Sequence, residues 1–130
     1  MRSVAGAARI ALVVGMVAVT AYGGIGDGIP TAREAASVLQ LAAAVLQLVY
    51  GGLSIAILLA MAFRPRAVAA LLIAWGVALT AVGTLAPVVW GEQSWAVGAA
   101  GGLATFAIAA LVNVGWRAHA RSLGEARAGR

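Results

Sequence analysis

Charged residues are scarce in this sequence. Of its 130 residues 10% are charged and 63% are apolar, and the mean hydropathy is +1.00. A soluble domain of this size needs far more polar surface. The uncharged runs 10–26, 35–63, 67–91 and 93–116 are each long enough for a membrane-spanning helix, which needs roughly 20 apolar residues. The sequence therefore predicts an all-α integral membrane protein: one transmembrane domain forming an up-down four-helix bundle, with spans at about 4–25, 35–63, 67–89 and 95–116.

Cysteine and lysine are absent, and His119 is the single histidine. The lack of cysteine excludes disulfides, thiol redox chemistry and Cys-ligated metals. One histidine cannot supply bis-His haem ligation within a chain, and it leaves zinc without a ligand set. His119 also follows the last span, on the side opposite most of the acids, so no serine–histidine–carboxylate group can assemble within the bundle. We therefore expect no catalytic residue and no metal site, and the sequence requires no cofactor.

The charges are distributed unevenly between the two sides of the predicted bundle. Eight of the nine arginines fall on one side: Arg2, Arg9, Arg64, Arg66, Arg117, Arg121, Arg127 and Arg130. The positive-inside rule then places both termini on the cytoplasmic side of the membrane, with 117–130 as a basic cytoplasmic tail, and we expect that membrane to be a bacterial inner (plasma) membrane. The net charge of +5 thus reflects topology, and the expected partner is the lipid bilayer, not nucleic acid. The first span also has the profile of a signal peptide, but it contains no clear A-x-A site, and we favour a retained helix.

The segment "GGIGDGIP" (23–30) is predicted to connect the first two spans. Its glycines end the first helix, and Pro30 excludes a continuous helix into the second. Thr31 and Glu34 have the T-x-x-E spacing of a capping box, which predicts a second helix beginning at Ala32. On this interpretation Asp27, Arg33, Glu34 and Glu92 all lie at the outer surface, and no acid lies near the centre of a span.

The second helix carries the one organised polar stripe. Its members lie within an arc of about 100° at helical spacing, bordered by Tyr50: Ser37, Gln40, Ala44, Gln47, Gly51 and Ser54. Such a stripe must face protein or water, because an unpaired amide in hydrocarbon is costly. Either the stripe forms hydrogen bonds between helices, or it lines a cavity. The ligand-binding or pore-lining candidates are Gln40, Gln47, Tyr50, Ser54, Arg33 and Glu34.

Small and polar residues share one face on each of the last two helices. Such faces allow close helix contact, and we interpret them as packing surfaces: Gly76 and Thr80 on the third helix, and Gly98, Gly102 and Asn113 on the fourth. Trp90 and Trp95 suit the outer interfacial belt, and Trp116 is expected at the inner interface.

The stretch 46–79, "LQLVYGGLSIAILLAMAFRPRAVAALLIAWGVAL", places a glycine-containing helix before a short arginine turn and an alanine-rich helix. Together with "GGIGDGIP", it resembles the DoxX-like family of small four-span bacterial membrane proteins. That family often has a lysine after the first span and a carboxylate within the second, where this chain has Asp27 and Gln47. The family has links to quinone or thiosulfate oxidation and to membrane redox complexes, so the resemblance implies a role as a subunit of such a complex.

Two functions are compatible with these features. The first is a non-catalytic membrane protein, either an accessory subunit of a membrane complex or a binder of a small apolar ligand between helices. The alternative is a small dimeric transporter or channel with a polar path along the second helix. A bundle this small has limited internal volume, so a homo-oligomer or a larger complex is expected in either case.

Overall fold

A computed structural model describes residues 2–91 and 93–129, with the backbone alone for Arg2, Ser3, Ala5, Ala126 and Arg127. The described chain forms four α-helices: α1 (Arg2–Arg33), α2 (Val38–Phe63), α3 (Val68–Val89) and α4 (Trp95–Ala128). A 3-10 turn, η1 (Pro65–Ala67), joins α2 to α3. All four helices are long and apolar enough to cross a membrane. The predicted all-α four-helix membrane bundle is therefore confirmed.

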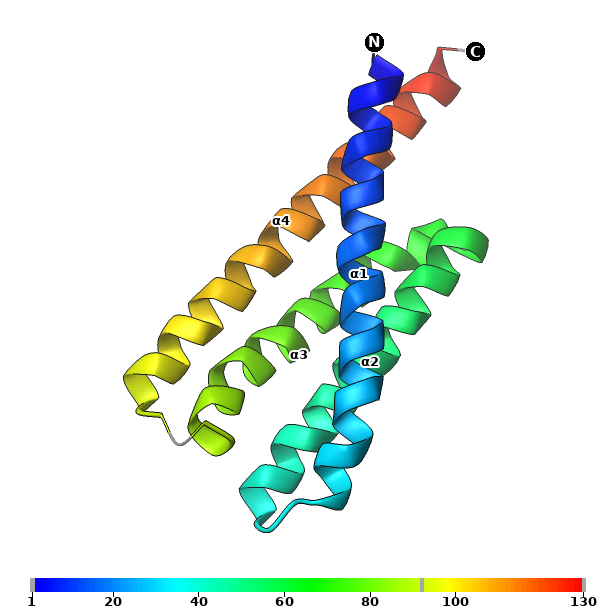
Figure 1. The fold of residues 1–130 in the computed structure, drawn as a ribbon. Coiled ribbons are helices and arrows are strands. Elements are labelled where there is room, and N and C mark those ends of the chain that lie inside the picture. Colours follow the sequence, from blue (N-terminus) through cyan, green and yellow to red (C-terminus); the bar gives the residue numbers. More distant parts are fainter. Residues whose placement is uncertain (1, 92, 130) are drawn as a thin grey trace.

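The bundle consists of two helical hairpins, α1–α2 and α3–α4, and the helices make their most extensive contacts within each hairpin. Packing of α2 on α3 holds the two hairpins together, with a smaller contact between α1 and α4. Figure 1 shows both termini at one end of the molecule, where α1 and α4 extend beyond the η1 turn, and the α1–α2 and α3–α4 loops at the other end. The most deeply buried side chains lie where α1, α2 and α3 meet: Val17, Ser54, Ile57, Val68, Leu72 and Trp75.

The first helix does not end at residue 25 as predicted. It continues through every glycine of "GGIGDGIP" and past Pro30 to Arg33. The reason is close packing on α2, which local sequence signals do not report. A Cβ atom at Gly24 would lie 2.7 Å from Gly51 Cα, and one at Gly28 would lie 2.8 Å from Leu48 Cδ2. These glycines let the two backbones approach each other, and the contact offsets glycine's low helix propensity of about 1 kcal/mol.

The predicted T-x-x-E capping box is also wrong. The Thr31 hydroxyl donates to the Asp27 carbonyl within α1, and Glu34 follows the last residue of that helix. The cap of α2 lies further along: Ser37 is its N-cap, and Ser37 Oγ accepts a hydrogen bond from the Gln40 backbone N–H at 3.1 Å. Gln40 Oε1 accepts from the N–H of Ala36, the residue before the N-cap, at 2.8 Å, so an S-x-x-Q pair caps this helix in a variant of the capping box.

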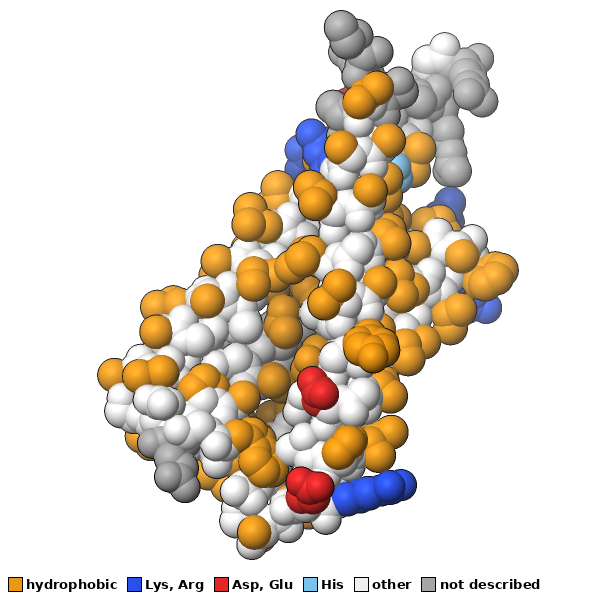
Figure 2. Space-filling model, in the orientation of Figure 1, with side chains coloured by type: hydrophobic (Ala, Val, Ile, Leu, Met, Phe, Trp, Pro, Cys, Tyr) orange, Lys and Arg blue, Asp and Glu red, His pale blue; other side chains and the backbone are white. Residues whose placement is uncertain are grey.

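The charged side chains are distributed unevenly between the two ends of the bundle. Arg9, Arg64, Arg66, Arg117 and Arg121 belong to the end that holds the termini, together with Glu125, whereas Arg33 and Glu34 lie at the α1–α2 loop. Figure 2 shows one face, with basic side chains toward the termini and acids, with a basic side chain beside them, over the loop-side half of α1. The predicted outer acid Glu92 and the terminal Arg130 lie outside the described residues, as do the side chains of Arg2 and Arg127.

The fourth helix and its tryptophan differ from the predicted picture. α4 continues as helix through most of the segment 117–130, to Ala128. Trp90 and Trp95 are 37% and 61% exposed at the loop end, where an interfacial belt was predicted. Trp116 was expected at the inner interface, but it is 6% exposed and belongs to the buried core. Its ring lies 5.5 Å from that of His119, one turn further along the helix.

Candidate functional site

The candidate residues of the predicted polar stripe separate into three places in the structure. Gln40 caps the start of α2, and Arg33 and Glu34 are exposed at the adjoining loop. Ser54 is fully buried between helices. Gln47 and Tyr50 lie between these two levels, where α1 crosses α2.

Ser54 belongs to a hydrogen-bonded cluster that joins three helices. Its hydroxyl lies 2.9 Å from the Thr20 hydroxyl of α1 and accepts a hydrogen bond of 2.9 Å from Trp75 Nε1 of α3. Ser54 also donates to the Tyr50 carbonyl at 2.8 Å, and Thr20 donates to the Val17 carbonyl at 2.8 Å. Each polar atom therefore has a partner, as a low-dielectric interior requires. These hydrogen bonds block the polar stripe at Ser54, so a continuous polar path along α2 would require the cluster to separate.

Asp27 lies much deeper than the surface position predicted for it. It sits on α1 between Gly24, which packs on Gly51, and Gly28, which packs on Leu48. Counted from Val38, those α2 residues are fourteenth and eleventh in a helix of 26. At 1.5 Å per residue Asp27 is level with a point roughly 15–20 Å along α2, and it lies about 9 Å from the end of α1 at Arg33, in the loop-side half of the bundle. Asp27 therefore lies inside the membrane-spanning helix α1, six residues before its end at Arg33, and not in a connecting loop as predicted, because α1 is longer than predicted.

The neighbours of Asp27 include two residues of the predicted stripe. Gln47 and Tyr50 lie on the stretch of α2 that packs against α1 next to Asp27, where a Cβ at Gly24 would lie 3.0 Å from the Gln47 carbonyl oxygen. Tyr50 itself is 8% exposed. On its lipid-facing side Asp27 borders a hollow of about 460 Å³, whose other walls are Ala21, Tyr22, Ile25, Gly26 and Ile55.

The α3–α4 hairpin is held together by glycines that face threonines and backbone. A Cβ at Gly98 would lie 2.6 Å from the Thr84 carbonyl oxygen, and one at Gly102 would overlap the Thr84 hydroxyl. Toward the termini, a Cβ at Gly76 would lie 3.2 Å from that of Ala109. Asn113, expected as a packing residue, donates to its own helix at Ala109 O (2.9 Å) and across the interface to Leu72 O (3.4 Å).

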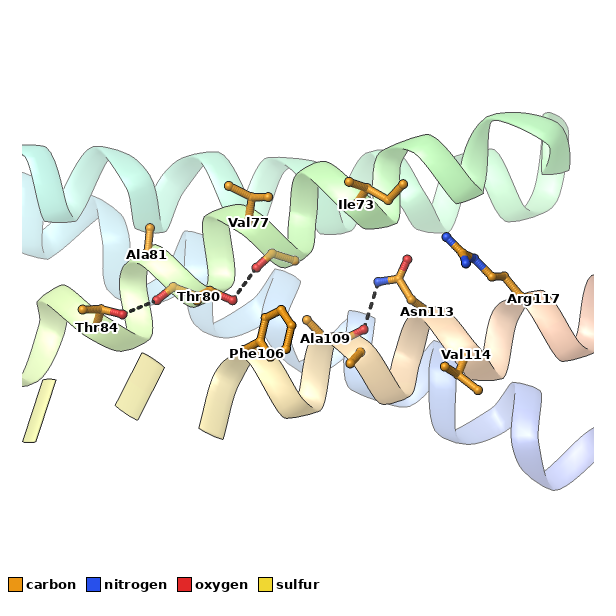
Figure 3. Close-up of a pocket in the computed structure, with 12 residues that line it drawn as sticks. Ile73, Val77, Thr80, Ala81, Thr84, Phe106, Ala109, Asn113, Val114 and Arg117 are labelled. Carbon is orange, nitrogen blue, oxygen red and sulfur yellow. Dashed lines mark hydrogen bonds between the residues drawn. The ribbon is translucent and has the colours of Figure 1, made fainter. Parts of the chain in front are cut away.

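An elongated groove of about 630 Å³ follows this α3–α4 interface, and we call it the α3–α4 groove. Its lining is Ile73, Gly76, Val77, Thr80, Ala81, Thr84, Phe106, Ala109, Ala110, Asn113, Val114 and Arg117. The volume lies within the range of about 300–1,000 Å³ that is usual for small-molecule sites. Figure 3 shows Asn113 and Arg117 together at the end nearer the termini, with Thr80 and Thr84 further along α3.

The polar groups of the groove are few and unevenly placed. The Thr80 and Thr84 hydroxyls donate to carbonyls of their own helix, Gly76 O at 2.8 Å and Thr80 O at 2.9 Å, which leaves their lone pairs to face the groove. Arg117 supplies the one full charge among the lining residues. The groove is thus apolar for most of its length, with a cationic group at one end. None of the predicted ligand-binding residues lines it, although the predicted packing residues Gly76, Thr80 and Asn113 do.

Sequence reasoning missed Asp27 as a membrane-embedded residue, Trp75 as a core donor, and Arg117 as a groove residue. The S-x-x-Q spacing of Ser37 and Gln40 was a readable signal that α2 starts late, and hence that the chain before it has room to remain helical. Within the described residues, no group of three or more histidine, cysteine or acidic side chains could hold a metal ion.

Comparison of the chain with protein-family models, with curated proteins and with solved structures gave no match.

Proposed function

We propose that this membrane protein is non-catalytic and binds an amphipathic ligand along the α3–α4 groove, either on its own or as an accessory subunit of a membrane complex. The observation that carries the proposal is the composition of the groove: apolar walls, two threonines, an amide, and Arg117 at the end nearer the termini. An arginine at the membrane surface attracts an anionic or acceptor-rich head group, and an apolar groove accommodates the attached chain. The positive-inside distribution favours the cytoplasmic leaflet of a bacterial inner membrane as the side where that head group lies.

Native mass spectrometry of the full chain, extracted in native-like lipid, tests this proposal. We expect the wild-type protein to retain an amphipathic molecule at a fixed stoichiometry. Ala110→Phe should abolish its retention, because Ala110 lines the groove and a phenyl ring there occupies it. The matched control is Ala104→Phe, an equal change at an exposed α4 position outside the described groove lining. A wild-type protein that carries no bound amphiphile, or equal retention in both variants, contradicts the proposal.

The same experiment reports on partners. A role as an accessory subunit, including the place in a redox complex that the DoxX-like resemblance implies, predicts that a second protein or a second copy accompanies the chain in native-like lipid. A membrane complex of defined mass supports the role as an accessory subunit. A lone monomer with a bound ligand instead supports a protein that binds its ligand on its own.

A second candidate function is a small dimeric transporter with a path along α2. It is favoured by one observation, the position of Asp27 inside the spanning helix α1 next to the stretch of α2 that carries Gln47 and Tyr50, since ionisable residues within spans commonly mark transport paths. Solute flux into liposomes that contain the protein, lost in the Gln47→Leu variant, supports the transporter function. Flux that is unaffected by this change contradicts it.

A further inference from the structure

The hollow beside Asp27 combines features that the α3–α4 groove does not have. It holds a carboxylate inside the membrane-spanning helix α1, and its other lining residues are Ala21, Tyr22, Ile25, Gly26 and Ile55. We propose that this hollow binds a lipophilic organic cation, an amine or quaternary ammonium carried on an apolar body.

The first reason is the cost of a carboxylate at this depth. An ionised side chain inside a membrane span is costly, and it is normally compensated by a partner charge. The residues that share the hollow with Asp27 supply no positive charge. Arg33 is the closest arginine along α1, and the six residues from Asp27 to Arg33 separate them by roughly 9 Å along the helix axis. A cation that arrives with the ligand meets this requirement.

The second reason is the shape and chemistry of the walls. Tyr22 is 85% exposed beside Asp27, and a tyrosine ring attracts organic cations through its face. Ile25 and Ile55 supply apolar surface for the body of the ligand. A Cβ placed on Gly26 has no atom within 4 Å, so this glycine leaves open space beside the carboxylate instead of serving helix packing. The volume of about 460 Å³ suits a molecule of drug-like size.

The third reason is that Asp27 is anchored from its other side. Gly24 and Gly28 fix the α1 backbone against α2 on either side of it. The position of the carboxylate is therefore set by helix packing and not by a mobile loop. Such preorganisation lowers the cost of binding.

The test uses the full chain in zwitterionic lipid nanodiscs and a pair of probes with the same shape and opposite charge. Tetraphenylphosphonium is the cationic probe, tetraphenylborate is the anionic one, and empty nanodiscs give the partition background. We expect saturable binding of the cation alone. Asp27→Asn should weaken it by at least about tenfold, Asp27→Glu should retain most of it, and Tyr22→Leu should give an intermediate loss.

Two controls separate this site from general effects. Glu34→Gln removes an acid at the end of the same hairpin, outside the described lining of the hollow, and should change affinity by less than about twofold. Ala110→Phe blocks the α3–α4 groove and should leave cation binding intact, so the two proposals fail independently. Circular dichroism and thermal unfolding establish that Asp27→Asn is folded. Equal cation binding by folded Asp27→Asn and wild type, or saturable binding of the anion at the same site, overturns the proposal.

Discussion

At the scale of single residues, Trp75 and Ser54 connect the two hairpins. The Trp75 indole is fully buried and donates to the Ser54 hydroxyl at 2.9 Å, with Thr20 within 3.3 Å of the same nitrogen. A membrane interior supplies no water to replace such a bond, although measured interhelical hydrogen bonds average only about 0.6 kcal/mol. The cluster therefore has more influence on which helix faces meet than on overall stability.

We predict that Ser54→Ala lowers the free energy of unfolding by about 0.6–1.7 kcal/mol, because Trp75 keeps only its longer contact with Thr20. Unfolding in mixed micelles, followed by tryptophan fluorescence, measures the change. Thr105→Val is the matched control, since the Thr105 hydroxyl donates to Gly101 and Gly102 of its own helix. A loss for Thr105→Val as large as for Ser54→Ala contradicts a special role for the cluster.

The position of Asp27 could not be predicted from the local sequence. The glycines and Pro30 around it are typical of a turn, and a turn places Asp27 in water. Its actual depth depends on contacts of Gly24 and Gly28 with α2, between residues more than 18 positions apart in the chain. A local signal cannot contain that information, whereas the number and composition of the spans follow from hydropathy alone.

At the scale of helices, the α1–α2 contact depends on two glycines that face each other. A Cβ at Gly51 would lie 2.9 Å from Ile25 N, and one at Gly24 would lie 2.7 Å from Gly51 Cα. Both neighbours are backbone atoms, which cannot move aside as a flexible side chain can. The adjacent glycines, Gly23 and Gly52, have nothing within 4 Å of a Cβ. The chain thus contains its own matched pairs for testing the packing of this hairpin.

We predict that Gly24→Ala and Gly51→Ala each destabilise the protein by about 1–3 kcal/mol, the usual cost of overpacking. Gly23→Ala and Gly52→Ala should be neutral or should stabilise it by up to about 1 kcal/mol, because alanine is the better helix former. Thermal unfolding of the four variants in the same detergent provides the comparison. If the two members of a pair behave alike, the close α1–α2 approach is not the source of the effect.

The helices also differ in how well their boundaries and packing faces can be predicted from the sequence. The predicted spans 67–89 and 95–116 begin within one residue of α3 and α4, because the η1 arginine turn and the tryptophan-flanked loop interrupt the apolar runs there. No such interruption marks the end of α1. The predicted packing faces of α3 and α4 contain Gly76, Gly98 and Gly102, but the groove beside them arises from the relative placement of two helices, which no single-helix pattern encodes.

At the scale of the whole molecule, the charge distribution and the fold together predict the orientation. Both termini and the η1 turn lie at the arginine-rich end, and the two remaining loops lie at the other end (Figure 1). Positive charge is retained on the cytoplasmic side of the membrane. The α3–α4 groove then carries its arginine toward the cytoplasm, and the Asp27 hollow lies in the outer half of the bundle, nearer the α1–α2 loop.

The absence of cysteine makes this orientation directly testable, because each introduced cysteine is the only one in the chain. Ser37→Cys and Gln93→Cys, at the two loops, should react with a membrane-impermeant maleimide added to intact spheroplasts. Arg66→Cys and Leu123→Cys, in the turn and the last part of α4, should react only after the membrane is opened, since these exposed positions lie at the opposite end. Labelling of Leu123→Cys in intact spheroplasts would show that the topology is the opposite of the predicted one, with the head-group end of the α3–α4 groove in the outer leaflet.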